Sequence, residues 1–79
     1  MTCCRYEDFQ LLEELGHAES VDWDLGTCKR CGSFLLRQWS EHAPASIFVD
    51  RLTTEEGTAF RESRGRARIM LLKRWYADH

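Results

Sequence analysis

The chain has 79 residues, of which 43% are hydrophobic and 30% are charged, and its formal net charge is −2. This size and composition favour a folded globular chain over a disordered one, so we expect one domain over residues 1–79 with a small core. The sequence has no apolar run of the roughly 20 residues that a membrane span needs, and the N-terminus MTCCRYEDF has no apolar signal core. We therefore expect a cytoplasmic protein without a membrane anchor.

Residues 6–15, YEDFQLLEEL, carry apolar side chains at positions 6, 9, 12 and 15, a spacing typical of a helix. Acidic residues suit the first turn of such a helix, and Gly16 suits the position just past its end. Phe9 and Leu11 would instead alternate on a strand. We expect a helix here, with a strand as the alternative.

Residues 20–27, SVDWDLGT, alternate between apolar and polar side chains, which is the period of a half-buried strand with Asp22 and Asp24 on its solvated side. Residues 33–39, SFLLRQW, are rich in strand formers. The glycine-ended turn CKRCG between these two runs predicts a β-hairpin. A loop follows, and residues 47–52, IFVDRL, are a third strand candidate.

From Thr53 to about Ala77 the pattern is helical, and Thr53 with Glu56 fits a capping box at its start. Gly65 lies in the middle, where the helix would bend or break. The expected fold is therefore α+β, with a small three-stranded antiparallel sheet packed against a long C-terminal helix. The helix residues expected to share one apolar face are Phe60, Ala67, Leu71 and Trp75.

The cysteines Cys3, Cys4, Cys28 and Cys31 are the main functional signal. In a reducing compartment they are more typical of a metal or redox site than of disulfides, and structural zinc stabilises a chain this short. A tight C-x-x-C turn directs two thiolates at one point, which suits tetrahedral zinc. We expect all four cysteines to bind one zinc ion, with the C-x-x-C turn as a knuckle on the hairpin.

The 15 residues DWDLGTCKRCGSFLL, at 22–36, resemble the C-x-x-C-G knuckle of zinc ribbons and rubredoxins. The resemblance is to small bacterial zinc-ribbon-like proteins, and it implies a zinc-stabilised hairpin. The chain departs from the zinc-ribbon pattern in the second half of the site. Zinc ribbons have a second C-x-x-C knuckle there, whereas this sequence has only the adjacent pair Cys3 and Cys4.

The remaining ligands are open on sequence grounds. Adjacent cysteines seldom bind the same ion because their side chains diverge, so a site with one of Cys3 and Cys4 and with His17 is an alternative. His42 and His79 are further candidates. A thiol redox pair, or cysteines without a ligand role, are the other interpretations. The redox interpretation fits poorly. A redox C-x-x-C pair lies at the N-terminus of a helix, which lowers the pKa of its thiols, whereas strand-like runs flank the pair in this sequence.

Charge is unevenly distributed. Residues 1–27 hold seven acidic residues and one arginine, and residues 61–79 hold six basic residues and two acidic ones. We expect the two ends to attract each other or to form solvated faces. The alternative is a nucleic-acid-binding regulator that uses Arg61, Arg64 and Arg68, which share one stripe of the expected helix.

Ile69, Leu72 and Tyr76 lie opposite the main apolar face of this helix. They predict either a second buried face or an exposed strip for a protein partner or a second copy of the chain. The sequence contains no catalytic motif, so we do not expect an enzyme. The expected function is a non-catalytic, zinc-stabilised module for protein interaction or regulation.

Overall fold

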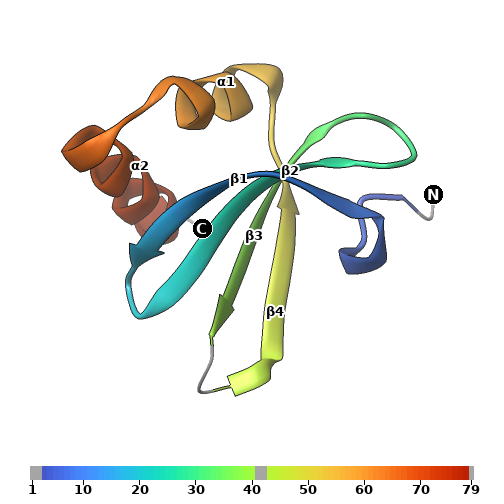
Figure 1. The fold of residues 1–79 in the computed structure, drawn as a ribbon, viewed down its shortest axis with the longest axis horizontal. Helices are drawn as coiled ribbons and strands as arrows, with labels where there is room; N and C mark the ends of the chain where they lie inside the picture. Colours follow the sequence, from blue (N-terminus) through green and yellow to red (C-terminus); the bar gives the residue numbers. More distant parts are fainter. Residues whose placement is uncertain (1–2, 41–42, 79) are drawn as a thin grey trace.

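The computed structural model describes residues 3–40 and 43–78, which fold into one antiparallel sheet and two helices (Figure 1). The sheet has four strands in the order β1-β2-β3-β4, so each strand pairs with its neighbour in sequence. The α+β class is confirmed, but the sheet has one strand more than the three expected. The elements in chain order are η1 (Tyr6–Asp8), β1 (Phe9–Ala18), β2 (Val21–Cys28), β3 (Phe34–Ser40), β4 (Ala43–Arg51), α1 (Thr54–Glu62) and α2 (Gly65–Asp78).

The additional strand is β1, which replaces the helix expected over residues 6–15. Only the short 3-10 turn η1 precedes it. Two register shifts against β2 interrupt β1, one between Leu11 and Glu13 and one between Glu14 and Gly16. Each shift breaks the alternation of inward and outward side chains. Leu15 and Ala18, three residues apart, both join the core under the helices, whereas Leu12 is about half exposed. A spacing of three is also found along one face of a helix, so the apolar pattern did not identify the strand and the sequence prediction was wrong.

The predicted hairpin is confirmed, because β2 and β3 pair without a register shift and the CKRCG turn joins them. β4 contains residues 47–51 of the third strand candidate, begins earlier at Ala43 and pairs with the other side of β3. Trp23 and Leu25 on β2 and Leu36 on β3 are at most 1% exposed. These three side chains lie on the face of the sheet that the helices cover.

Helices α1 and α2 cover one face of the sheet, whereas the N-terminal segment lies at the other side (Figure 1). The helix residues Phe60, Leu72 and Trp75 join the apolar core on the covered face. Neither helix in the described part of the chain is long and apolar enough to cross a membrane. Among the residues whose burial is described, the buried members of this core are Leu15, Ala18, Trp23, Leu25, Leu36, Leu52, Phe60, Leu72 and Trp75.

The single helix expected from Thr53 to about Ala77 is two helices. The capping box is confirmed, since the Thr53 hydroxyl accepts from the N–H of Glu56 and the Glu56 carboxylate accepts from the N–H of Thr53. Helix α1 ends at Glu62, and α2 begins at Gly65 with a φ of +55°. Glycine adopts this left-handed conformation without a Cβ clash, so the chain changes direction there. Gly65 therefore breaks the helix.

Candidate metal centre

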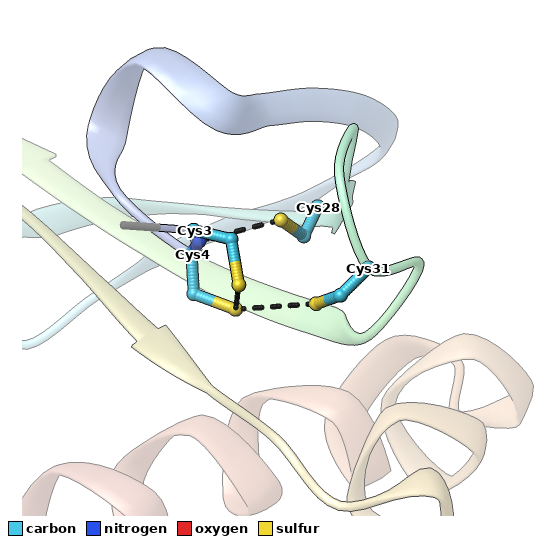
Figure 2. Close-up of side chains that lie close together, drawn as sticks. All are labelled: Cys3, Cys4, Cys28 and Cys31. Carbon is cyan, nitrogen blue, oxygen red and sulfur yellow. Dashed lines mark hydrogen bonds between the residues drawn. The ribbon is translucent and has the colours of Figure 1, made fainter. Parts of the chain in front are cut away.

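Four cysteine side chains from two distant parts of the sequence meet at one end of the sheet (Figure 2). Cys3 and Cys4 belong to the N-terminal segment, whereas Cys28 and Cys31 belong to the turn between β2 and β3. Their four Sγ atoms all lie within 4.8 Å of one another. The cysteines form no disulfide. This group of ligand atoms can therefore hold a metal ion.

Backbone hydrogen bonds shape the turn that carries Cys28 and Cys31. The N–H of Cys28 donates to the carbonyl of Ser33 at 2.9 Å, and the N–H of Gly32 donates to the carbonyl of Cys28 at 2.9 Å. Gly32 has a φ of +77°, a conformation that glycine adopts at no steric cost. The turn curls back on itself and brings both sulfurs beside the N-terminal pair (Figure 2).

The backbone at Cys4 explains why two adjacent cysteines can face the same point. Cys4 has a φ of +67°, in the left-handed region that costs a non-glycine residue roughly 1–2 kcal/mol. The Sγ atoms of Cys3 and Cys4 lie 3.9 Å apart, and the Sγ atom of Cys4 lies 3.5 Å from that of Cys31. Four sulfurs in a tetrahedron at ~2.3 Å from zinc would be about 3.8 Å apart. The observed spacings fit such an ion.

Asp8 fastens the N-terminal segment to the turn, and the sequence analysis missed it. Its side chain is 7% exposed and accepts from Nε of Arg30 at 3.0 Å and from the backbone N–H of Arg5 at 3.2 Å. Its backbone carbonyl accepts from the N–H of Lys29 at 2.8 Å. The signal in the sequence was an acidic residue just after the cysteine pair, which can reach the basic pair inside the C-x-x-C turn.

The four thiols differ in acidity. Burial raises the pKa of Cys3, and burial also raises the pKa of Cys4 to about 12. Burial acts on Cys28 too, but backbone N–H groups that donate to its sulfur outweigh it and lower the pKa of Cys28. The hydroxyl and N–H of Ser33 lower the pKa of Cys31 to about 6. The turn therefore offers a thiolate at Cys31 and a thiol of increased acidity at Cys28, whereas the N-terminal pair carries protons that a bound cation would displace.

A small apolar cluster supports the cysteines on their face of the sheet. Its three buried residues compare with nine in the core under the helices. A cluster of this size contributes little burial energy of its own. The buried members are Phe9, Cys28 and Leu35, and the partly buried side chains packed against them are Cys3, Cys4 and Val49.

The histidine alternative is wrong for His17. This residue lies at the far end of the β1–β2 pair from Cys28, where it is paired with Asp22. Its Nδ1 atom lies 3.1 Å from Oδ1 of Asp22. His42 and His79 lie outside the described residues. Among the described residues, only the four cysteines form a group with metal-ligand spacing.

The arginines expected to form a nucleic-acid-binding stripe are separated. Arg61 belongs to α1 and Arg64 to the break between the helices, whereas Arg68 belongs to α2 and is 8% exposed. Arg68 lies 2.7 Å from the carboxylate of Glu13 and donates to the carbonyl of Phe60. Its ion pair is the attraction expected between the acidic and basic ends of the chain. A buried, paired arginine cannot contact phosphate, so the predicted stripe is wrong at this position.

The strip of Ile69, Leu72 and Tyr76 is not an exposed partner surface. Leu72 is fully buried in the core, and Ile69 packs against the same core. Tyr76 is half exposed, and its ring meets the edge of Trp23 with 6.3 Å between ring centroids. Helix α2 turns this face to the sheet. The alternative of a second buried face is therefore confirmed at Leu72 and Ile69 but not at Tyr76, and the three residues do not form the continuous exposed strip expected for a partner.

No protein-family model matches this chain, and no curated protein or solved structure matches it either. The case for a function therefore depends on the chemistry of the described side chains. Of these, the four convergent thiols carry the clearest chemical signature, which is that of a metal site.

Proposed function

We propose that the four cysteines bind one zinc ion and that the chain is a non-catalytic, zinc-stabilised module for protein interaction or regulation. The observation that carries the proposal is the convergence of four Sγ atoms within 4.8 Å of one another from two segments far apart in the sequence. Tetrahedral sites with four sulfur ligands are typical of zinc, and four thiolates leave no open position for a substrate. The ion would thus be structural.

Energetics supports a structural ion at this end of the sheet. Ordering the backbone of residues 3–8 costs roughly 1–2 kcal/mol per residue. Burial of Phe9 and Leu35 contributes about 1.5–3 kcal/mol for each side chain, which does not offset that cost. Structural zinc binds peptides of this ligand type with about 10–16 kcal/mol at neutral pH. A zinc ion would therefore decide whether the N-terminal segment stays on the sheet.

A thiol redox function has weaker support. Redox C-x-x-C pairs lie at the N-terminus of a helix, whereas Cys28 and Cys31 lie between two strands. A reducing compartment such as the cytoplasm would keep all four thiols available for the ion. The interaction role is supported by apolar side chains outside the core, each about half exposed or more. These are Tyr6, Leu11, Leu12, Phe48, Met70 and Tyr76.

The test is the metal content of protein purified without a metal-affinity tag from metal-replete culture. We expect one zinc per chain and no stoichiometric iron by elemental analysis. Substitution with cobalt should give the visible absorption of a tetrahedral thiolate site. A metal-free chain with the same folded NMR spectrum as the untreated protein would contradict the proposal.

A further inference from the structure

A second candidate site lies on the cysteine side of the sheet but away from the cysteines. There the first three strands enclose a hollow of about 400 Å³. No motif in the sequence pointed to it. The side chains that supply its charge and its aromatic surface are Glu14, His17, Asp22, Asp24, Arg37 and Trp39.

The strand register places acidic groups in this hollow directly beside one another. Glu14 on β1 pairs with Asp24 on β2, and Asp22 is two residues from Asp24 on the same strand. Like charges opposite each other on a sheet destabilise it. Arg37 and Trp39 offset this repulsion at Asp24, and His17 lies beside Asp22, but no interaction is seen for Glu14 within the described residues, so a bound cation would relieve the repulsion that remains.

Asp24 is the centre of the hollow. The sequence analysis placed it on a solvated side, but its side chain is only 7% exposed. Its Oδ2 atom accepts from Nε of Arg37 at 3.0 Å, from the terminal nitrogen Nη2 of Arg37 at 2.6 Å and from Nε1 of Trp39 at 3.1 Å. No donor of the described residues reaches Oδ1. A nine-tenths buried carboxylate thus retains one oxygen with free acceptor capacity.

Charge and shape both favour an organic cation. Three carboxylates share one guanidinium and the imidazole of His17, whose Nδ1 lies 3.1 Å from Oδ1 of Asp22. The guanidinium of Arg37 is already held by Asp24, and its Cζ atom lies 4.4 Å from the centroid of the Phe9 ring. The Trp39 ring lines the same hollow, and aromatic rings attract ammonium and guanidinium groups. The carboxylates are not spaced as metal ligands, since the four cysteines are the only such group among the described residues. An organic cation therefore fits the hollow better than a metal ion.

We propose that this hollow binds an arginine or lysine side chain presented by a partner protein. The proposal deepens the interaction role proposed above, since it names the chemistry of the partner. A guanidinium or ammonium group would donate to the open oxygen of Asp24 and to the carboxylates of Asp22 and Glu14. Its alkyl stem would pack on Trp39. This binding chemistry does not involve the zinc ligands.

The experiment is an NMR titration of the isotope-labelled, zinc-analysed chain with three tripeptides. Acetyl-Gly-Arg-Gly-amide and acetyl-Gly-Lys-Gly-amide carry the cation, and acetyl-Gly-citrulline-Gly-amide is the neutral match for arginine. We expect saturable shifts of the Trp39 indole N–H and the Asp24 amide with at least one cationic peptide, and at least tenfold weaker binding of the citrulline peptide. Equal binding of citrulline and arginine peptides, or no saturable shift with either cation, would overturn the proposal.

Two variants locate the binding. Glu14→Gln combined with Asp22→Asn removes two charges without breaking the Asp24–Arg37 pair, and we expect binding to weaken at least tenfold. Glu55→Gln combined with Glu62→Gln, which removes two exposed charges on α1, is the matched control and should bind like the parent. If this control weakens binding as much as the first double variant, the attraction is not local and the proposal is wrong.

A titration with spermidine distinguishes a free polyamine from a protein side chain. Tenfold tighter binding of spermidine than of both cationic peptides would contradict a protein partner. The measured zinc content distinguishes a failure of the cation site from a failure of the zinc site. A zinc-free chain that still binds the peptides would contradict the zinc site alone, and a zinc-loaded chain that binds none would contradict the cation site alone.

Discussion

Within the described residues, the face of the sheet under α1 and α2 buries nine residues in one apolar core, whereas the opposite face buries Phe9, Leu35 and the cysteine Cys28. The first face is held by the burial of large side chains such as Trp23 and Leu72, at about 1.5–3 kcal/mol for each fully buried one. The second face is held by a turn, a buried aspartate and four thiols. A chain of this length can complete one apolar face and still need a different device for the other.

The variant Cys28→Ser removes one metal ligand and is the strongest test of whether the cysteine site stabilises its face of the sheet. We expect loss of stoichiometric zinc and of the cooperative thermal transition, because the binding energy of a structural zinc, about 10 kcal/mol or more, rivals the entire stability of a small domain. Elemental analysis and circular dichroism during heating measure both effects.

Lys29→Ala is the matched control for this ligand variant. Lys29 is exposed in the same turn, and its hydrogen bond to Asp8 comes from the backbone, so zinc content and melting should be unchanged. A Cys28→Ser chain that melts within about 4–8 °C of the parent, the shift that 1 kcal/mol produces at this size, would show that the thiols do not hold the fold.

The helix-covered face should respond differently to Leu72→Ala. Leu72 is fully buried, so we expect the free energy of unfolding to fall by about 2–5 kcal/mol while zinc stoichiometry stays at one per chain. Urea denaturation followed by tryptophan fluorescence measures the loss. Met70→Ala, at a site 63% exposed on the same helix, should change stability by less than about 0.5 kcal/mol. Loss of zinc from Leu72→Ala would contradict the separation of the two faces.

The acidity of the thiols predicts how zinc affinity depends on pH. Burial raises the pKa of Cys3 and of Cys4, whereas hydrogen bonds lower the pKa of Cys28 and of Cys31 from their ordinary value of 9.0. Cys31 is therefore already a thiolate between pH 7 and pH 8 and releases no proton to zinc, so zinc affinity should rise with pH less steeply than for four ordinary thiols.

Competition with a chromophoric chelator at several pH values measures this slope. Below a pH of about 6, Cys31 also takes up a proton, so the slope should steepen. Four ordinary thiols would release nearly four protons and give a slope of about 10⁴-fold per pH unit between pH 7 and pH 8. A slope that steep would contradict the split between the turn and the N-terminal pair.

Asp8→Asn tests the contact that joins the N-terminal pair to the turn. The variant keeps the shape but removes the charge that holds Arg30, so we expect zinc affinity to fall about 10–100-fold, as for groups that orient metal ligands. The same chelator competition measures it. Glu7→Gln, at an exposed site in the same 3-10 turn, is the control and should keep the affinity of the parent. Equal affinities of parent and Asp8→Asn would mean that Asp8 orients no ligand.

Much of the fold was predictable because its signals are local. Alternation predicted β2, and the Thr53–Glu56 box predicted the start of α1. β1 was not predictable from its apolar period, because two register shifts interrupt the period of two and Leu12 is about half exposed although it fits the helical spacing. The helix break depended on a positive φ at Gly65, and sequence alone cannot tell a tolerated glycine from one that uses this freedom.

The site was predictable as a residue set but not as a geometry. Two adjacent cysteines can face one centre because Cys4 adopts a positive φ. A positive φ is uncommon at cysteine, so nothing in the sequence indicated it. Asp8 and Asp24 were missed for one reason. A charged side chain in a polar position is expected to be solvated, and its burial depends on partners, Arg30 and Arg37, that the fold brings from other segments.

The smallest expected effect comes from Thr53→Ala at the start of α1. Its hydroxyl accepts from the N–H of Glu56, and loss of such a cap costs about 1 kcal/mol. Because α1 packs only on the helix-covered face, the loss should appear in urea denaturation and leave zinc affinity unchanged. Thr58→Ala, an exposed position within the same helix, is the matched control and should not destabilise the chain. If Thr53→Ala weakened zinc binding, the two faces would be coupled through β4, which leads directly into α1. The two faces would then not be independent sources of stability.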